Sequence, residues 1–173
     1  MEQNCSKTKI VCNIRKVFSQ FLLEATFMYV CTLTKKNMPH ITPVLYFYEK
    51  EWCVLNFLVN KHSIKAKNLR MNPYVSLTTD ETHPTNPFLN TGIMLEAVAQ
   101  LSESYTDVQE CLVNLRSKYR SQLKTELVET FATENEMCVK AYLLKGVYWK
   151  GPFFQNFICV ARRSPDDPLW KKP

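Results

Sequence analysis

The spacing of apolar residues changes from a helical to a strand-like pattern near residue 26. Before that point apolar side chains recur every three or four positions, which predicts an N-terminal helix over residues 8–24. The residues that set this spacing are Ile10, Ile14, Val17, Phe18 and Phe21. After it come FMYVCTLT, HITPVLYFY and EWCVLNFLV, which are rich in β-branched and aromatic residues and are separated by the turn-like segments KKNMP and EKE. This second pattern predicts three antiparallel strands connected as a meander.

The second of these strands contains Pro43. Proline has no N–H to donate to a strand ladder, so it is found on edge strands or at bulges. We therefore expect an edge or a bulge at this position.

The segment NFLVNKHSIKAKNLRMNP, residues 56–73, combines the end of a strand with a short basic helix. Ser63 is a typical N-cap, and Asn72-Pro73 ends the helix, which is expected over roughly residues 64–71. Lys65 then falls in the first turn, where the helix dipole disfavours a cation. Either the lysines are simply solvated, or an anion is held between the helix N-terminus and Lys65.

The rest of the chain predicts three more strands and two more helices. The strands are YVSLTT, IMLEAVAQLSES and MCVKAYLLKGVYWKG; one helix follows Thr106 and a shorter one covers about residues 125–134. Six strands with one helix inserted after the third predict a mainly β protein with flanking helices (α+β), built as a small antiparallel barrel. We expect a single domain over residues 1–173, with the barrel core at 27–150 and an extended C-terminal tail at 151–173.

Composition excludes several classes of site. Only three glycines occur among 173 residues, too few and too scattered for a Rossmann fingerprint or a P-loop. The seven cysteines include no close C-x-x-C pair and the three histidines lie in separate settings, so we expect reduced thiols and no metal. No apolar run reaches about 18 residues and the N-terminus lacks a signal-peptide core, so we expect a cytoplasmic protein without a membrane span.

The net charge of +6 would attract anions, including nucleic acid. Its basic residues are spread along the chain, and its aromatic residues follow strand-core patterns instead of lying beside basic clusters. A basic nucleic-acid-binding barrel therefore ranks last among the functions considered.

The stretch MPHITPVLYFYEKEWCVLNFLVNKHSIKAKNLRMNPYVSL resembles the FMN-binding split β-barrel family, typified by pyridoxamine 5′-phosphate oxidase. That family has a strand with spaced prolines, a tight hairpin, and a strand ending before the pattern S-x-K-x-x-N-L-x-x-N-P. The matching residues, in order, are Pro39, Pro43-Val44, Phe47, Ser63, Lys65, Asn68-Leu69 and Asn72-Pro73. The resemblance covers about residues 27–102.

The resemblance implies a set of cofactor-binding residues. The flavin phosphate would lie at the start of the helix, at Ser63, Ile64 and Lys65. Its ring would face the second strand, and Val59 and Asn60 would offer backbone groups. The second-strand residues are His40, Thr42, Pro43 and Val44, and the alternative for His40 and Thr42 is that they are ordinary edge-strand residues. Trp149 would stack on the ring from a partner subunit, although an aromatic residue near a barrel end is more often a packing residue.

The function implied is that of an FMN-dependent oxidoreductase acting on a small organic substrate. The protein would be a homodimer with the cofactor at the subunit interface. Flavin chemistry needs little from the protein beyond position and electrostatics, and no catalytic residue is assigned. The alternatives are a deazaflavin-dependent reductase in the same groove, or a non-catalytic flavin- or haem-binding protein.

Overall fold

The computed structural model describes residues 17–120 and 135–158. Along the chain lie a helix over residues 17–24, β1 (Met28–Leu33), β2 (Pro39–Val44), β3 (Phe47–Glu49), β4 (Val54–Asn60), α2 (Ile64–Met71), β5 (Tyr74–Glu81), a 3₁₀ turn (Pro87–Leu89), β6 (Thr91–Ser102), α3 (Tyr105–Tyr119), β7 (Glu136–Lys150) and β8 (Phe153–Ile158). Residues 8–16 of the first predicted helix, the helix predicted near 125–134 and most of the predicted tail lie outside the described residues.

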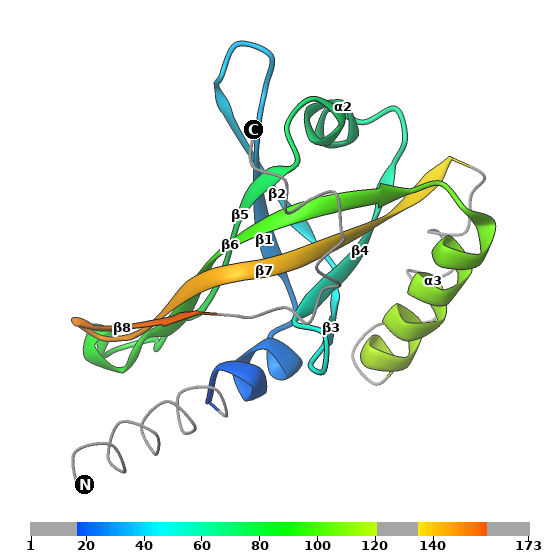
Figure 1. Cartoon of the computed structure of the whole chain (residues 1–173). Coiled ribbons are helices and arrows are strands. Elements are labelled where there is room, and N and C mark those ends of the chain that lie inside the picture. The colour runs from blue at the N-terminus through cyan, green and yellow to red at the C-terminus, as the bar shows by residue number, and fades with distance from the viewer. Residues whose placement is uncertain (1–16, 121–134, 159–173) are drawn as a thin grey trace, which may run out of the picture.

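The strands form one antiparallel sheet in the order β2-β1-β5-β6-β7-β4-β3, and β8 pairs with the far end of β7. Strands β2 and β3 stand at opposite ends of this order, yet only Leu45 and Tyr46 separate them in the chain. Such a connection spans at most roughly 11 Å. The sheet must therefore curl until its two ends meet, which makes it a barrel (Figure 1).

The corner between β2 and β3 is held by two buried tyrosines. The Tyr46 hydroxyl donates to the Leu22 carbonyl at 2.7 Å, and the Tyr46 amide donates to the Tyr119 hydroxyl at 3.2 Å. The Tyr119 hydroxyl lies 2.7 Å from the Thr26 carbonyl and 2.8 Å from that of Tyr46. The corner is thus tied both to the first helix and to α3.

The strand count differs from the six predicted. The second predicted strand is divided at the Leu45–Tyr46 corner into β2 and β3, and the beginning of the predicted tail forms β8. The mainly antiparallel fold itself is confirmed, and so is the edge position that Pro43 predicted, because β2 is the first strand of the order.

Two helices close the barrel and a third covers its outside. Phe18 and Leu22 of the first helix, and Ala66 and Leu69 of α2, pack into the same barrel core. Figure 1 shows these two helices at opposite ends of the barrel. Helix α3 lies outside, against β3, β4 and β7, where Leu112 and other apolar residues form a second cluster. None of the described helices is long and apolar enough to cross a membrane.

The barrel has a split between β2 and β4. Strand β3 pairs with β4 only from Val54 to Asn56, and β2 pairs with β1. The rest of β4, up to Asn60, is paired with β7 on one side, and in the described sheet no strand pairs with it on the other. Two strand edges therefore face a gap in the ladder, close to the start of α2.

Candidate functional site

A cavity of about 680 Å³ lies at this split. Its walls come from β2, the end of β4, the start of α2, the first residue of β7 and one residue of α3. The lining residues are Phe27, His40, Thr42, Pro43, Val44, Leu45, Leu58, Val59, Asn60, Ser63, Ile64, Lys65, Leu115 and Glu136. The volume falls within the range of roughly 300–1,000 Å³ that is usual for cofactor-sized ligands.

One end of the cavity is polar and contains the helix N-terminus. Ser63 caps α2 by accepting a hydrogen bond from the Ala66 amide at 3.1 Å, as its sequence position predicted. The first amides of a helix, here those of Ile64 and Lys65, have no acceptor within the helix. Because the Ser63 oxygen already accepts, its own O–H is available as a further donor. This end of the cavity therefore offers several donors to an anion.

Lys65 adds a half-buried positive charge to the same end. Burial lowers its pKa to about 8, and the Glu136 carboxylate acts in the opposite direction. Burial also raises the pKa of Glu136, and Lys65 acts against that shift. Both side chains are thus held where their charged forms are poorly solvated, which is typical of residues that meet a charged ligand.

The β2 side of the cavity contains two buried polar atoms without a hydrogen-bond partner among the described residues. They are Nδ1 of His40 and Oγ1 of Thr42. Buried polar groups in folded proteins are nearly always paired, because an unpaired one costs about 1–3 kcal/mol. Two such atoms on one cavity wall make this wall a candidate surface for hydrogen-bonding a ligand.

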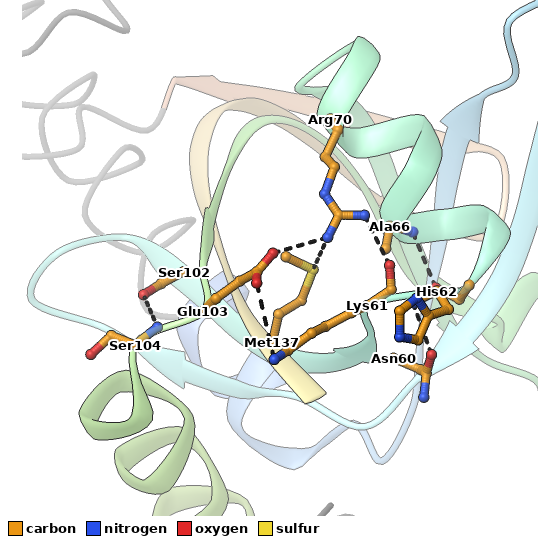
Figure 2. A network of polar contacts seen from close by, with 10 residues as sticks. Asn60, Lys61, His62, Ala66, Arg70, Ser102, Glu103, Ser104 and Met137 are labelled. Carbon is orange, nitrogen blue, oxygen red and sulfur yellow. Dashed lines mark hydrogen bonds and ion pairs between the residues drawn. The ribbon is translucent and has the colours of Figure 1, made fainter. Parts of the chain in front are cut away.

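The loop before α2 is braced from behind by Arg70. Figure 2 shows its guanidinium between the Lys61 carbonyl, which accepts from Nη1 at 2.9 Å, and the Glu103 carboxylate, 3.0 Å from Nη2. The Lys61 ammonium lies 4.0 Å from the same carboxylate. In addition, the Asn60 side chain accepts from the His62 amide at 2.9 Å. The turn that presents Ser63 and Lys65 is therefore fixed at both of its ends.

The remaining motif residues hold α2 in place. Asn68 is buried and donates from Nδ2 to Oγ1 of Thr32 on β1 at 2.9 Å. Leu69 packs in the barrel core, and the Asn72 side chain accepts from the Tyr74 amide at 3.0 Å, which starts β5. The pattern S-x-K-x-x-N-L-x-x-N-P thus contains cavity residues at its beginning and structural residues at its end.

The structure brings together all of the predicted cofactor-binding residues except Trp149. Val59 packs in the barrel core and also lines the cavity, and the contact of its main chain with a cofactor stays a prediction. Trp149 lies near the far end of β7, opposite Gly92. A Cβ on Gly92 would come within 2.5 Å of the indole, so this glycine makes room for the ring. Stacking of Trp149 in a partner's site stays a prediction, and so does cofactor binding by the other residues.

Sequence reasoning missed five cavity residues: Phe27, Leu45, Leu58, Leu115 and Glu136. The apolar ones carry no signal that separates them from core residues. Glu136 reaches the site because β4 and β7 pair with Asn60 opposite Glu136, a contact between distant parts of the chain. Among the described residues, no group of three or more His, Cys, Asp or Glu side chains could hold a metal ion.

Fold and cavity together define a split β-barrel with a cavity at the split. Comparison with known structures supports this class. A conserved hypothetical protein from Mycobacterium tuberculosis is 18% identical, with a TM-score of 0.67 over 79% of this chain and 84% of that one. The heme storage protein HutZ from Vibrio cholerae is 15% identical, with a TM-score of 0.62 over 83% and 92% of the two chains. An F420 reductase is 16% identical, with a TM-score of 0.54 over 72% and 92%.

The sequence itself gives the family. The model of the pyridoxamine 5′-phosphate oxidase family matches residues 14–139, and the chain belongs to this family. No curated protein matches it in sequence. Identities below 25% show a shared fold, so the ligand has to be argued from the cavity.

Proposed function

We propose that this protein binds FMN in the cavity at the split and acts as an oxidoreductase on a small organic substrate. The observation that carries the proposal is the pairing, in one cavity, of a capped helix N-terminus beside Lys65 with the unpartnered polar atoms of His40 and Thr42. FMN has a phosphate suited to the first group and a ring edge of hydrogen-bonding atoms suited to the second.

Each residue then has a definite task. The amides of Ile64 and Lys65, the Ser63 hydroxyl and the Lys65 ammonium would hold the phosphate. His40 and Thr42 would hydrogen-bond the polar part of the ring, while Leu45, Leu58 and Leu115 would exclude water from its apolar part. When bound, the flavin would supply the hydride or electron transfer, and the protein would supply position and electrostatics.

A second copy of the chain would complete the site. A row of side chains crosses the outer face of the sheet through paired positions on five strands: Pro43, Tyr29, Thr78, Met94 and Val147. Tyr29 and Met94 are 44% and 43% exposed, and Ile41 beside this row is 63% exposed. Thr78 is the polar member of this row, and Ser76, Glu96 and Lys145 lie beside it. Exposed apolar side chains rimmed by polar ones are typical of a protein–protein interface. We propose a two-fold homodimer that covers this face and places the cofactor between the subunits.

Haem is the second candidate ligand, and a specific observation favours it. The His40 imidazole has an unpartnered nitrogen in an otherwise largely apolar cavity, and imidazole is a common axial ligand of haem iron. The structurally similar Vibrio cholerae protein is named as a heme storage protein. A deazaflavin coenzyme is a further alternative, in line with the similarity to an F420 reductase.

Absorbance spectroscopy of the purified protein, before and after titration with each ligand, tests the proposal. We expect saturable binding of FMN, with its visible bands perturbed on binding, and reduction of the bound flavin by a reduced nicotinamide cofactor. A protein that shifts and sharpens the Soret band of added haem, with no spectral change for FMN, would overturn the flavin proposal. In His40→Ala this shift would then be lost if His40 is the axial ligand.

A further inference from the structure

The cavity contains a negative charge at the end where the proposed function places a phosphate. Glu136, the first residue of β7, lines the cavity together with Lys65. Among the lining residues these two are the charged ones, one of each sign, and His40 is the third that can titrate. The cavity lining thus carries one charge of each sign, where a site built only for a dianion would carry an excess of positive charge.

The surrounding charges do not remove this conflict. Other charged and titratable groups around this end of the cavity include Lys61 and His62 before α2, Lys67 and Arg70 of α2, and Glu103 before α3, and none of these five lines the cavity. Lys61 and Arg70 are both engaged by the Glu103 carboxylate, at 4.0 and 3.0 Å (Figure 2). Glu103 offsets one of these two positive charges, and neither Lys61 nor Arg70 lines the cavity, so among the described lining residues Lys65 is the cation that accompanies Glu136.

A phosphate dianion brought to this end would meet an ionised carboxylate in a partly desolvated setting. Like charges at short range repel strongly where water is scarce, and the protein relieves this repulsion by taking up a proton. The helix N-terminus contributes only about half a positive charge. The two negative groups are the phosphate and the Glu136 carboxylate. Of these, Glu136 belongs to the protein, and burial already disfavours its charged form, so it can take up the proton.

We propose that Glu136 is a specificity-determining residue, which takes up a proton when FMN binds and makes the preference for the phosphorylated flavin depend on pH. The inference rests on the proposed function, since it assumes that the phosphate lies beside Lys65. Protonated Glu136 becomes a hydrogen-bond donor to the phosphate, whereas ionised Glu136 repels it. Riboflavin, which has no phosphate, does not require this proton.

The sign of the effect follows from linkage. A group whose pKa is higher in the complex than in the free protein favours binding at low pH, and binding weakens as the pH rises above its free value. With one proton taken up, the loss approaches tenfold per pH unit at most. Lys65 remains mainly charged below about pH 8, so the effect of Glu136 on binding is best measured below that pH.

The test is to measure the dissociation constants of FMN and riboflavin from about pH 5 to pH 7.5 for the wild-type protein, Glu136→Gln and Glu110→Gln. Glu110 is an exposed carboxylate on α3 that does not line the cavity. The flavin phosphate and every residue other than the substituted one are the same in all three proteins, so the comparison isolates Glu136. We expect the preference for FMN over riboflavin to fall with rising pH in the wild type and in Glu110→Gln. In Glu136→Gln the preference should be larger at pH 7.5, by about tenfold, and should decline less with pH.

Calorimetry of the wild-type protein in buffers of different ionisation enthalpy gives an independent readout. FMN binding at neutral pH should take up more protons than riboflavin binding does. Equal proton uptake for the two flavins, or the same pH profile in Glu136→Gln as in the wild type, would overturn the inference and leave FMN binding intact. Failure of both flavins to bind would instead overturn the proposed function, and the inference with it.

Discussion

At the residue scale, the unpaired hydroxyl of Thr42 is expected to destabilise the ligand-free protein and to form a hydrogen bond with the ligand in the complex. The hydroxyl is buried on the cavity wall without a protein partner, whereas Thr32 on the neighbouring strand is fully engaged. The Thr32 hydroxyl accepts from Asn68 at 2.9 Å and lies 3.4 Å from the His40 carbonyl. The two threonines have similar shapes and opposite hydrogen-bonding states, so they form a natural pair of test sites.

Thr42→Val should leave the free energy of unfolding of the ligand-free protein unchanged or raise it by up to about 1 kcal/mol, because an unsatisfied hydroxyl is removed. The same change should weaken FMN binding by about two- to tenfold, the equivalent of one neutral hydrogen bond. Urea denaturation and flavin titration measure the two effects separately.

Thr32→Val is the matched control. It leaves the buried Asn68 amide without its acceptor and should destabilise the protein by about 1–3 kcal/mol. Equal destabilisation by the two substitutions, or unchanged FMN binding by Thr42→Val, would show that the Thr42 hydroxyl does not face a ligand.

At the element scale, the second half of helix α2 packs against the barrel, and its first turn lines the cavity. Asn68 and Leu69 fix the helix against the barrel, and Arg70 reaches back to the loop that leads into it. The start and end of this helix were predictable from the sequence, because Ser63 and Asn72-Pro73 are local signals. The bracing of its loop was not, because Arg70 and Glu103 are 33 residues apart.

The division of one predicted strand into β2 and β3 also depends on contacts between residues far apart in the sequence. HITPVLYFY is rich in strand-forming residues, its Pro43 predicts an edge or a bulge, and nothing local marks Tyr46 as a corner. The corner exists because Tyr46 bonds to Leu22 and Tyr119, which lie 24 and 73 residues away. Likewise the predicted site residues from 40 to 65 belong to one continuous motif, whereas Glu136 and Leu115 join the cavity only through packing of β7 and α3.

Arg70→Ala tests whether this bracing matters to the site. The Arg70 and Glu103 side chains are 42% and 53% exposed, so their ion pair contributes at most about 1 kcal/mol to stability. We expect little change in melting temperature, faster hydrogen exchange at the Ile64 and Lys65 amides, and FMN binding weakened by about two- to fivefold.

Arg116→Ala is the control, because Arg116 is exposed on α3 and does not line the cavity. It should change neither the melting temperature, nor hydrogen exchange at these amides, nor FMN binding. Arg70→Ala with wild-type exchange rates and wild-type FMN affinity would mean that the loop keeps its position without the brace.

At the scale of the whole molecule, the outer face of the sheet points to assembly. The row through Tyr29 and Met94, with Ile41 beside it, leaves apolar side chains exposed across paired strands. A barrel that is otherwise closed by helices has no structural need for them at the surface. We therefore expect light scattering at micromolar concentration to give twice the chain mass of 20.3 kDa.

Ile41→Asp should convert this dimer to a monomer and weaken FMN binding together with dimerisation, because a buried charge without a partner is costly. Val113→Asp is the control: Val113 is 60% exposed on α3, much as Ile41 is 63% exposed on β2, but it lies away from this face. A wild-type mass near 20.3 kDa, or a dimer unaffected by Ile41→Asp, would contradict the assembly.

The central claim, that the start of α2 and Lys65 hold the phosphate of FMN, is tested most directly by titrating FMN and riboflavin into the wild-type protein, Lys65→Ala and Lys67→Ala. Lys67 is exposed on the same helix and does not line the cavity. Loss of a charged hydrogen bond worth about 1.5–3 kcal/mol should weaken FMN binding to Lys65→Ala by about 10- to 100-fold. Riboflavin binding to Lys65→Ala, and both ligands with Lys67→Ala, should stay close to wild type. Equal losses for FMN and riboflavin in Lys65→Ala, or no loss for either, would contradict a phosphate site at this helix.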